Sequence, residues 1–209
     1  MSHMPMSIDE GRTAVRLARE AVEAHVDGTN DAHSASNSRP FPDLRGVFVT
    51  INLAEPSEHR LRGCVGFPFP IKKLGDAIWE AAVAAASEDP RFPPVTSDEL
   101  GSIVFEVSIL TQPRDLEGSR LELPSRVTLG EDGLMVSYSS FSGLLLPQVA
   151  TEFGMDQEEF LSQACVKAGL LPDAWLDSKT RVQTFQAEVF AESSPRGGVV
   201  RLSTGGSQG

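Results

Sequence analysis

Two glycines flank a cysteine in the segment 61–66, of sequence LRGCVG. Glycine adopts backbone conformations that other residues avoid, and it lets another backbone or a ligand approach closely. An alternating run, residues 46–53, precedes this segment, and the proline-rich sequence FPFP follows it at positions 67–70. Cys64 is therefore expected at a strand end or a sharp turn, where its side chain can face a cleft.

The length and the charge of the chain limit its class. It has 209 residues, a formal net charge of −11 and a pI near 4.8, which favours one domain, or one core with a smaller appendage. An acidic balance disfavours non-specific binding to nucleic acids, because such binding depends on cations that displace phosphate counterions. No apolar run approaches the ~18 residues that a membrane-spanning helix needs. We therefore expect neither nucleic-acid nor membrane partners.

The termini and the cysteines indicate a cytoplasmic protein. The sequence begins with MSHM, which is typical of an expression tag, so residues 1–6 are expected to be a tag or a disordered start. The N-terminal part of the sequence has no basic segment followed by an apolar stretch, so it does not indicate a secretory signal. Without an export signal, Cys64 and Cys165 are expected to be reduced thiols. Two lone cysteines with no nearby pair of histidines also argue against a structural zinc site.

Apolar periodicity predicts an α+β fold. Alternation predicts strands and a spacing of three to four residues predicts helices. Strand patterns span residues 46–53, 60–65, 103–110 and 180–189, a hairpin is expected between 127–129 and 134–138, and helical patterns span 8–26, 71–88 and 156–168. Because these elements lack regular βαβ spacing, we expect a mainly antiparallel sheet flanked by helices.

Two polar stretches are expected to lie outside this core. Residues 27–42 are rich in Ser, Asn, Asp and Pro and should form a loop. Residues 193–209 consist mostly of Ser, Gly and Arg and are expected to be a flexible tail.

Four separated motifs connect the chain with a known family. They are LRGCVG at 61–66, EDPRFPP at 88–94, GLLLPQVA at 143–150 and KAGLLPDAW at 167–175. With them the chain resembles the AMMECR domain family, named after the chromosomal-region gene linked to the AMME syndrome. The resemblance runs from about residue 8 to about residue 192.

The resemblance carries expectations about architecture and partners. It implies an α+β domain over residues 7–192, with a larger and a smaller subdomain that meet at a cleft. In microbes the family's domain is found beside, or fused to, Memo-like and radical-SAM proteins, which implies partners of these kinds and a shared modification pathway. The resemblance points to no particular cofactor.

Cys64 has two interpretations. A free cysteine is commonly a small buried residue, and here it would fit a tight turn between glycines. Alternatively it is a reactive thiolate, favoured by Arg62 or Arg91 if they fold close by. The nearest histidine in sequence, His59, would lie ~16 Å away along an extended segment, too far to serve as its base unless the chain doubles back.

The two arginines near the cysteine are candidate anion contacts. Arg62 and Arg91 present planar guanidinium groups that suit a carboxylate or a phosphate. The structural alternative is a pair of salt bridges within the protein, with Glu88 or Asp89 as partners.

Four further residues complete the candidate site. Gly63 and Gly66 would shape the backbone around a ligand, Glu106 alternates away from the apolar face of its strand, and Gln148 follows a proline at a helix start. A solvated carboxylate for Glu106 and a turn-stabilising amide for Gln148 are the structural alternatives. The first functional hypothesis is therefore a binding module for a small anionic ligand or a partner segment. The second is an enzyme in which Cys64 supplies a thiolate for acyl transfer or for a redox or radical-linked modification.

Overall fold

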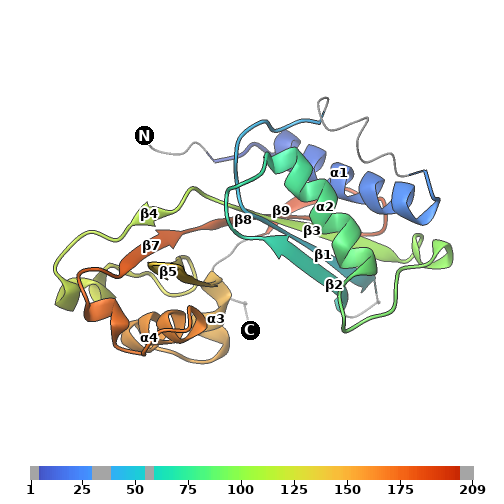
Figure 1. The fold of residues 1–209 in the computed structure, drawn as a ribbon. Coiled ribbons are helices and arrows are strands. Elements are labelled where there is room, and N and C mark those ends of the chain that lie inside the picture. Colours follow the sequence, from blue (N-terminus) through green and yellow to red (C-terminus); the bar gives the residue numbers. More distant parts are fainter. Residues whose placement is uncertain (1–4, 30–38, 55–58, 203–209) are drawn as a thin grey trace. The chain divides into compact units, whose positions relative to one another are not determined.

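The computed structural model describes residues 5–29, 39–54 and 59–202. Within these residues the chain forms two compact units. The first comprises the chain up to Leu110 together with Glu188–Leu202, and the second comprises Thr111–Ala187. Each unit has its own antiparallel sheet and its own helices (Figure 1). The predicted α+β class is confirmed.

The first unit contains a sheet with the strand order β2-β1-β3-β8-β9. Its strands are β1 (Val47–Ala54), β2 (His59–Phe67), β3 (Ile103–Leu110), β8 (Ala187–Glu192) and β9 (Val199–Leu202). The alternation predicted for β1 is confirmed, because Val49 and Ile51 are fully buried whereas Phe48 and Thr50 are half-buried. One face of this sheet is therefore apolar and covered, and the other is half-buried.

Helix α1 (Ile8–Val26) packs against β3 and β9 on the apolar face (Figure 1). It begins with a capping box, which the spacing of Ser7 and Glu10, three residues apart, indicates in the sequence. The Ser7 hydroxyl accepts a hydrogen bond from the backbone N–H of Glu10 at 3.2 Å, and the Glu10 carboxylate accepts one from the backbone N–H of Ser7 at 2.7 Å. No helix in the described part of the chain is long and apolar enough to cross a membrane.

Helix α2 (Leu74–Ser87) packs against β1, β2 and α1. It starts three residues later than the sequence pattern predicts. Ile71 is 74% exposed and Lys73 has extended backbone angles at the helix start, so the apolar residue at 71 does not belong to the buried stripe. The alanines of α2 are all buried, which lets its backbone lie close to the sheet.

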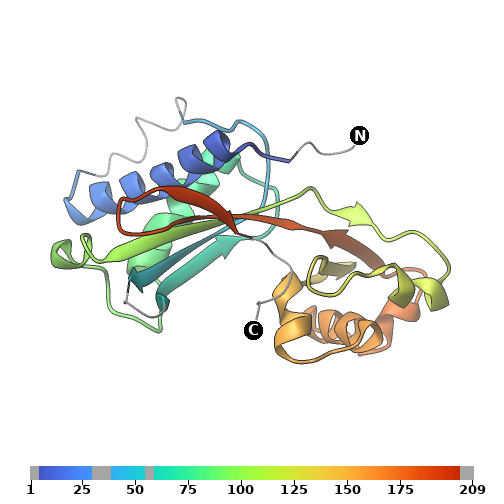
Figure 2. The same ribbon diagram turned by 180° about the vertical axis from the view of Figure 1, so that it is seen from behind.

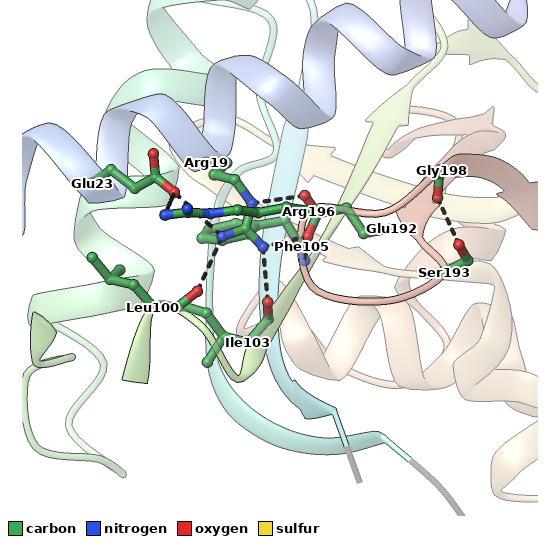
Figure 3. Close-up of polar contacts among 9 residues, drawn as sticks. All are labelled: Arg19, Glu23, Leu100, Ile103, Phe105, Glu192, Ser193, Arg196 and Gly198. Atoms are coloured by element: carbon green, nitrogen blue, oxygen red, sulfur yellow. Dashed lines mark hydrogen bonds and ion pairs between the residues drawn. The ribbon is translucent and has the colours of Figure 1, made fainter. Parts of the chain in front are cut away.

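A buried arginine connects α1 to the sheet of the first unit (Figure 3). The Nε and Nη2 atoms of Arg19 donate to the two carboxylate oxygens of Glu192 at 2.7 and 2.6 Å. The same guanidinium donates to the carbonyl oxygens of Leu100 and Ile103. Glu192 also accepts the backbone N–H of Phe105 at 3.1 Å. The Arg19–Glu192 ion pair thus joins α1 to β8, which are far apart in the sequence.

The second unit contains a sheet with the order β4-β7-β5-β6. Its elements are β4 (Arg114–Asp115), η3 (Arg120–Glu122), η4 (Pro124–Arg126), β5 (Gly133–Tyr138), β6 (Phe141–Leu145), α3 (Pro147–Glu152), α4 (Gln157–Lys167), η5 (Ala174–Leu176) and β7 (Arg181–Phe185). Helix α4 packs on β5 and β6 and buries Phe160 and Leu161 completely. Cys165 lies in this core and is fully buried.

Two strand predictions are wrong in detail. The pattern at 180–189 is not one strand but β7 and β8, which belong to different sheets. Between them Gln186 is exposed, and its backbone N–H donates to the Thr111 hydroxyl at 2.8 Å instead of to a neighbouring strand. The expected hairpin is also displaced, because β5 pairs with β6. Residues 127–129 form no strand, and Val127 instead enters the core after η4.

Both ends of the described chain are more ordered than expected. Residues 193–202 form a hairpin loop and β9, which pairs antiparallel with β8 and is drawn in red in Figure 2. Met6 is 7% exposed, its N–H donates to Glu188 at 2.8 Å, and Arg201 donates to its carbonyl oxygen. The antiparallel pairing of β9 with β8 accounts for this difference, since Val200 and Leu202 are themselves exposed. Residues 1–4, 203–209 and most of the expected loop, 30–38, lie outside the described residues.

Candidate functional site

Cys64 lies within β2, the edge strand of the first sheet, rather than at a strand end or in a turn. It is paired with Thr50 of β1. A bulge precedes it, since the pairing passes from Ile51 opposite Gly63 to Asn52 opposite Leu61 and leaves Arg62 as the extra residue. A bulge re-aims side chains and bends the strand.

Gly63 and Gly66 are needed for close approach. A Cβ atom on Gly63 would lie 2.1 Å from the carbonyl oxygen of Ala85 in α2, and one on Gly66 would lie 2.2 Å from the Phe48 ring. Neither glycine has a positive φ, so the requirement is space rather than backbone conformation. Gly63 thus lets α2 press on β2 directly behind Cys64.

A polar row crosses three strands on the face opposite the helices. Cys64 pairs with Thr50, and Thr50 pairs in turn with Glu106 of β3. Directly paired residues of a sheet share a face, and all three side chains are half-buried. The Thr50 hydroxyl donates a hydrogen bond to the Cys64 sulfur at 3.4 Å. Because neighbouring strands are ~4.8 Å apart, Glu106 lies about two strand spacings from Cys64.

Asp89 fixes the surroundings of Cys64 from the end of α2. Its carboxylate is 4% exposed and accepts the backbone N–H of Cys64 at 2.9 Å. It also accepts Arg91 Nε at 2.9 Å, Arg91 Nη2 at 2.7 Å and the backbone N–H of Arg91 at 3.1 Å. These four bonds give one buried carboxylate contacts with both the strand and the guanidinium.

Asp89 and Arg91 each shift the pKa of the other. The Arg91 guanidinium holds the pKa of Asp89 well below its usual range, and the backbone N–H groups of Cys64 and Arg91 lower it further, while burial opposes the shift. In turn the hydrogen bonds to Asp89 raise the pKa of Arg91, and the negative charge of Asp89 adds to this rise while burial opposes it. Arg91 is therefore a permanent cation that is joined through Asp89 to the backbone N–H of Cys64.

Arg62 is used differently from Arg91. Its side chain is 8% exposed and forms a two-pronged pair with Glu99, with distances of 2.7 and 3.0 Å, plus a bond to the Pro94 carbonyl. The Arg62 hydrogen bonds lower the pKa of Glu99 to about 2. The guanidinium carbons of Arg62 and Arg91 lie 5.9 and 5.5 Å from the centre of the Phe92 ring. Arg62 therefore anchors the loop that follows α2.

The structure divides the predicted site residues into two groups. Arg62, Gly63, Cys64, Gly66, Arg91 and Glu106 all belong to the first unit. Gln148 lies on α3 of the second unit, where its side chain is exposed. Of the two salt-bridge partners considered from the sequence, Asp89 does pair with Arg91, whereas Arg62 pairs with Glu99 instead.

The sequence analysis gives Thr50 no role in the site and names Asp89 only as a salt-bridge partner, not as a contact of Cys64. Thr50 was marked only by its position on the polar side of an alternating strand. Asp89 was marked by its place at the end of a helix, two residues before Arg91. Within the residues described, no group of three or more His, Cys, Asp or Glu side chains is arranged to hold a metal ion, and both cysteines are free thiols.

Comparisons with known proteins agree with this fold. A family model described as AMMECR1 matches residues 15–190. A protein from Thermofilum pendens is 47% identical over 203 residues, covering 93% of this chain and 95% of its own length. A protein from Thermococcus gammatolerans is 49% identical over 193 residues, covering 91% of this chain and 94% of its own.

A solved structure is similar as well. The crystal structure of the uncharacterized protein PH0010 from Pyrococcus horikoshii matches with a TM-score of 0.75 and 46% identity, over 92% of this chain and 96% of that one. The residues that the family model matches include the LRGCVG strand, α2 and the loop that carries Asp89 and Arg91. The chain belongs to the AMMECR1 family.

Proposed function

We propose that the sheet edge at Cys64 binds a ligand through an anionic group, with Arg91 as the anion contact and with Cys64 and Thr50 beside it. The observation that carries this proposal is the solvent exposure of the Arg91 side chain next to a buried carboxylate. This side chain is 53% exposed although its partner, Asp89, is buried. A cation that is both held in place and open to solvent is suited to receive a carboxylate or a phosphate.

The shape of a guanidinium supports this role. Asp89 engages Nε and Nη2 of Arg91, and a guanidinium carries five N–H donors in all. The Nη1 group is therefore the donor that we assign to the ligand. The row from Cys64 through Thr50 to Glu106 supplies a thiol, a hydroxyl and a carboxylate for the ligand's remaining polar groups.

Charge-selective alkylation of Cys64 tests the anion contact. Iodoacetate and iodoacetamide react alike, since the sulfur attacks the methylene carbon and iodide leaves, but only iodoacetate is an anion. We expect Arg91→Ala to lower the ratio of the iodoacetate rate to the iodoacetamide rate by roughly fivefold, as for one unit charge a few ångströms away in a water-accessible site. The two rates are measured at Cys64 by mass spectrometry of the alkylated peptide.

A matched control is available on α1. Arg12 is an exposed arginine paired with Asp9 at 2.7 Å, so Arg12→Ala removes the same charge from a similar surface pair. The ratio should stay at the wild-type value in Arg12→Ala. An equal ratio in wild type and Arg91→Ala would refute the anion site.

The second candidate function is nucleophilic chemistry at Cys64. The observation in its favour is the Thr50 hydroxyl, which donates to the sulfur at 3.4 Å and so supports negative charge there. The iodoacetamide rate in the same experiment tests this candidate. A rate well above that of a free peptide thiol at the same pH, and a lower rate in Thr50→Val, would favour the enzyme.

A further inference from the structure

We infer that Asp89 is the positioning residue of the site, and that Arg91 attracts an anion to Cys64 only while Asp89 holds its guanidinium. This inference rests on the proposed anion site and adds how that site is built. Asp89 does not contact the ligand in this arrangement. It acts through Arg91 and through the backbone of Cys64.

The bonding pattern supports a positioning role. Three of the four hydrogen bonds to Asp89 come from Arg91, and the fourth comes from the backbone N–H of Cys64. The Cys64 bond comes from the edge strand of the sheet, 25 residues away in sequence. One carboxylate thereby sets the position of the cation relative to the sulfur. An arginine loses much conformational freedom when it is fixed in this way, and Asp89 supplies the bonds that offset that loss.

The two ways in which Asp89 could act have opposite signs. If Asp89 were only a negative charge near the sulfur, its removal would favour the approach of an anion, because like charges repel. If Asp89 positions Arg91, its removal lets the guanidinium leave the sulfur, and the anion preference falls. The iodoacetate-to-iodoacetamide ratio therefore separates the two roles by direction.

The decisive variant is Asp89→Asn, which keeps the size of the side chain and removes the charge. We expect its ratio to fall to within about twofold of the Arg91→Ala ratio, and the double variant Asp89→Asn/Arg91→Ala to fall no further, because both changes remove one coupled interaction. The control is Asp9→Asn, which removes the carboxylate of the exposed Arg12–Asp9 pair on α1, and in which the ratio should not fall. A ratio at or above the wild-type value in Asp89→Asn would overturn the inference.

A second variant decides the question if Asp89→Asn fails to fold. Arg91→Lys changes a half-exposed side chain and keeps the charge, but lysine is a point charge that cannot form the two-pronged pair with Asp89. We expect Arg91→Lys to lose most of the anion preference, whereas a wild-type ratio would contradict positioning by Asp89. The anion site at Arg91 and the positioning role of Asp89 can be refuted separately. An unchanged ratio in Arg91→Ala removes the anion site itself, while a lowered ratio there with an unchanged one in Asp89→Asn or Arg91→Lys removes only the role of Asp89.

Discussion

Replacing Arg19 by alanine is expected to lower the free energy of unfolding by about 3–5 kcal/mol, the cost of leaving one partner of a buried ion pair uncompensated. The side chains of Arg19 and Glu192 are 8% and 5% exposed, so water does not replace the lost contact. The change would also remove the bonds to two backbone carbonyls and the contact of the guanidinium with the Phe105 ring, at 4.7 Å. Urea denaturation followed by circular dichroism gives the difference.

The neighbouring arginine on the same helix provides the control. Arg16 is 69% exposed and pairs with Glu20 at 3.6 Å, so Arg16→Ala should cost no more than about 0.5 kcal/mol. Arg196, in the loop between β8 and β9, is also exposed and pairs with Glu23 on the solvent side of Arg19 (Figure 3). Equal losses in Arg19→Ala and Arg16→Ala would show that the buried pair does not hold α1 to the sheet.

Gly63→Ala is the second substitution with a large expected effect, a loss of about 1–3 kcal/mol in the free energy of unfolding. The new Cβ would lie 2.1 Å from the carbonyl oxygen of Ala85. That oxygen belongs to the backbone of α2, so no side-chain rotation relieves the clash, and either the helix or the edge strand must shift. The stabilisation that alanine brings by restricting the unfolded chain, about 0.4–1 kcal/mol, is smaller.

Gly101→Ala is the matched control for this prediction. Gly101 is exposed and has no positive φ, and a Cβ added there would meet no atom within 4 Å. The free energy of unfolding of Gly101→Ala should therefore stay within about 0.5 kcal/mol of the wild-type value. If Gly63→Ala were as stable as Gly101→Ala in urea denaturation, α2 would not pack against β2 as described.

Local patterns in the sequence sufficed for much of the fold. The alternation at 46–53 and 103–110 predicted β1 and β3, and Ser7 with Glu10 predicted the start of α1, because strand faces and helix caps depend on residues a few positions apart. Where the chain leaves one sheet for another, the sequence carries no such signal. The alternation simply continues through Gln186, and only the two sheets determine that β7 and β8 are separate strands.

The candidate site was predictable in part for the same reason. The glycines around Cys64 indicated a close approach of another backbone, and α2 supplies it. The partners of the two arginines were harder to assign. Arg91 pairs with a residue two positions away, whereas Arg62 pairs with Glu99, 37 residues away. A contact over that distance is set by how α2 and its following loop pack on the sheet, which periodicity does not specify.

Competition by sulfate for the alkylation of Cys64 tests the central claim most directly. The iodoacetate rate at Cys64 is measured against increasing sulfate, with chloride adjusted to keep the ionic strength constant, in wild type and in Arg91→Ala. If an anion binds beside the sulfur, sulfate should slow the reaction along a saturating curve in the wild type and leave Arg91→Ala unaffected. A wild-type rate that does not respond to sulfate at constant ionic strength would contradict an anion site at Cys64.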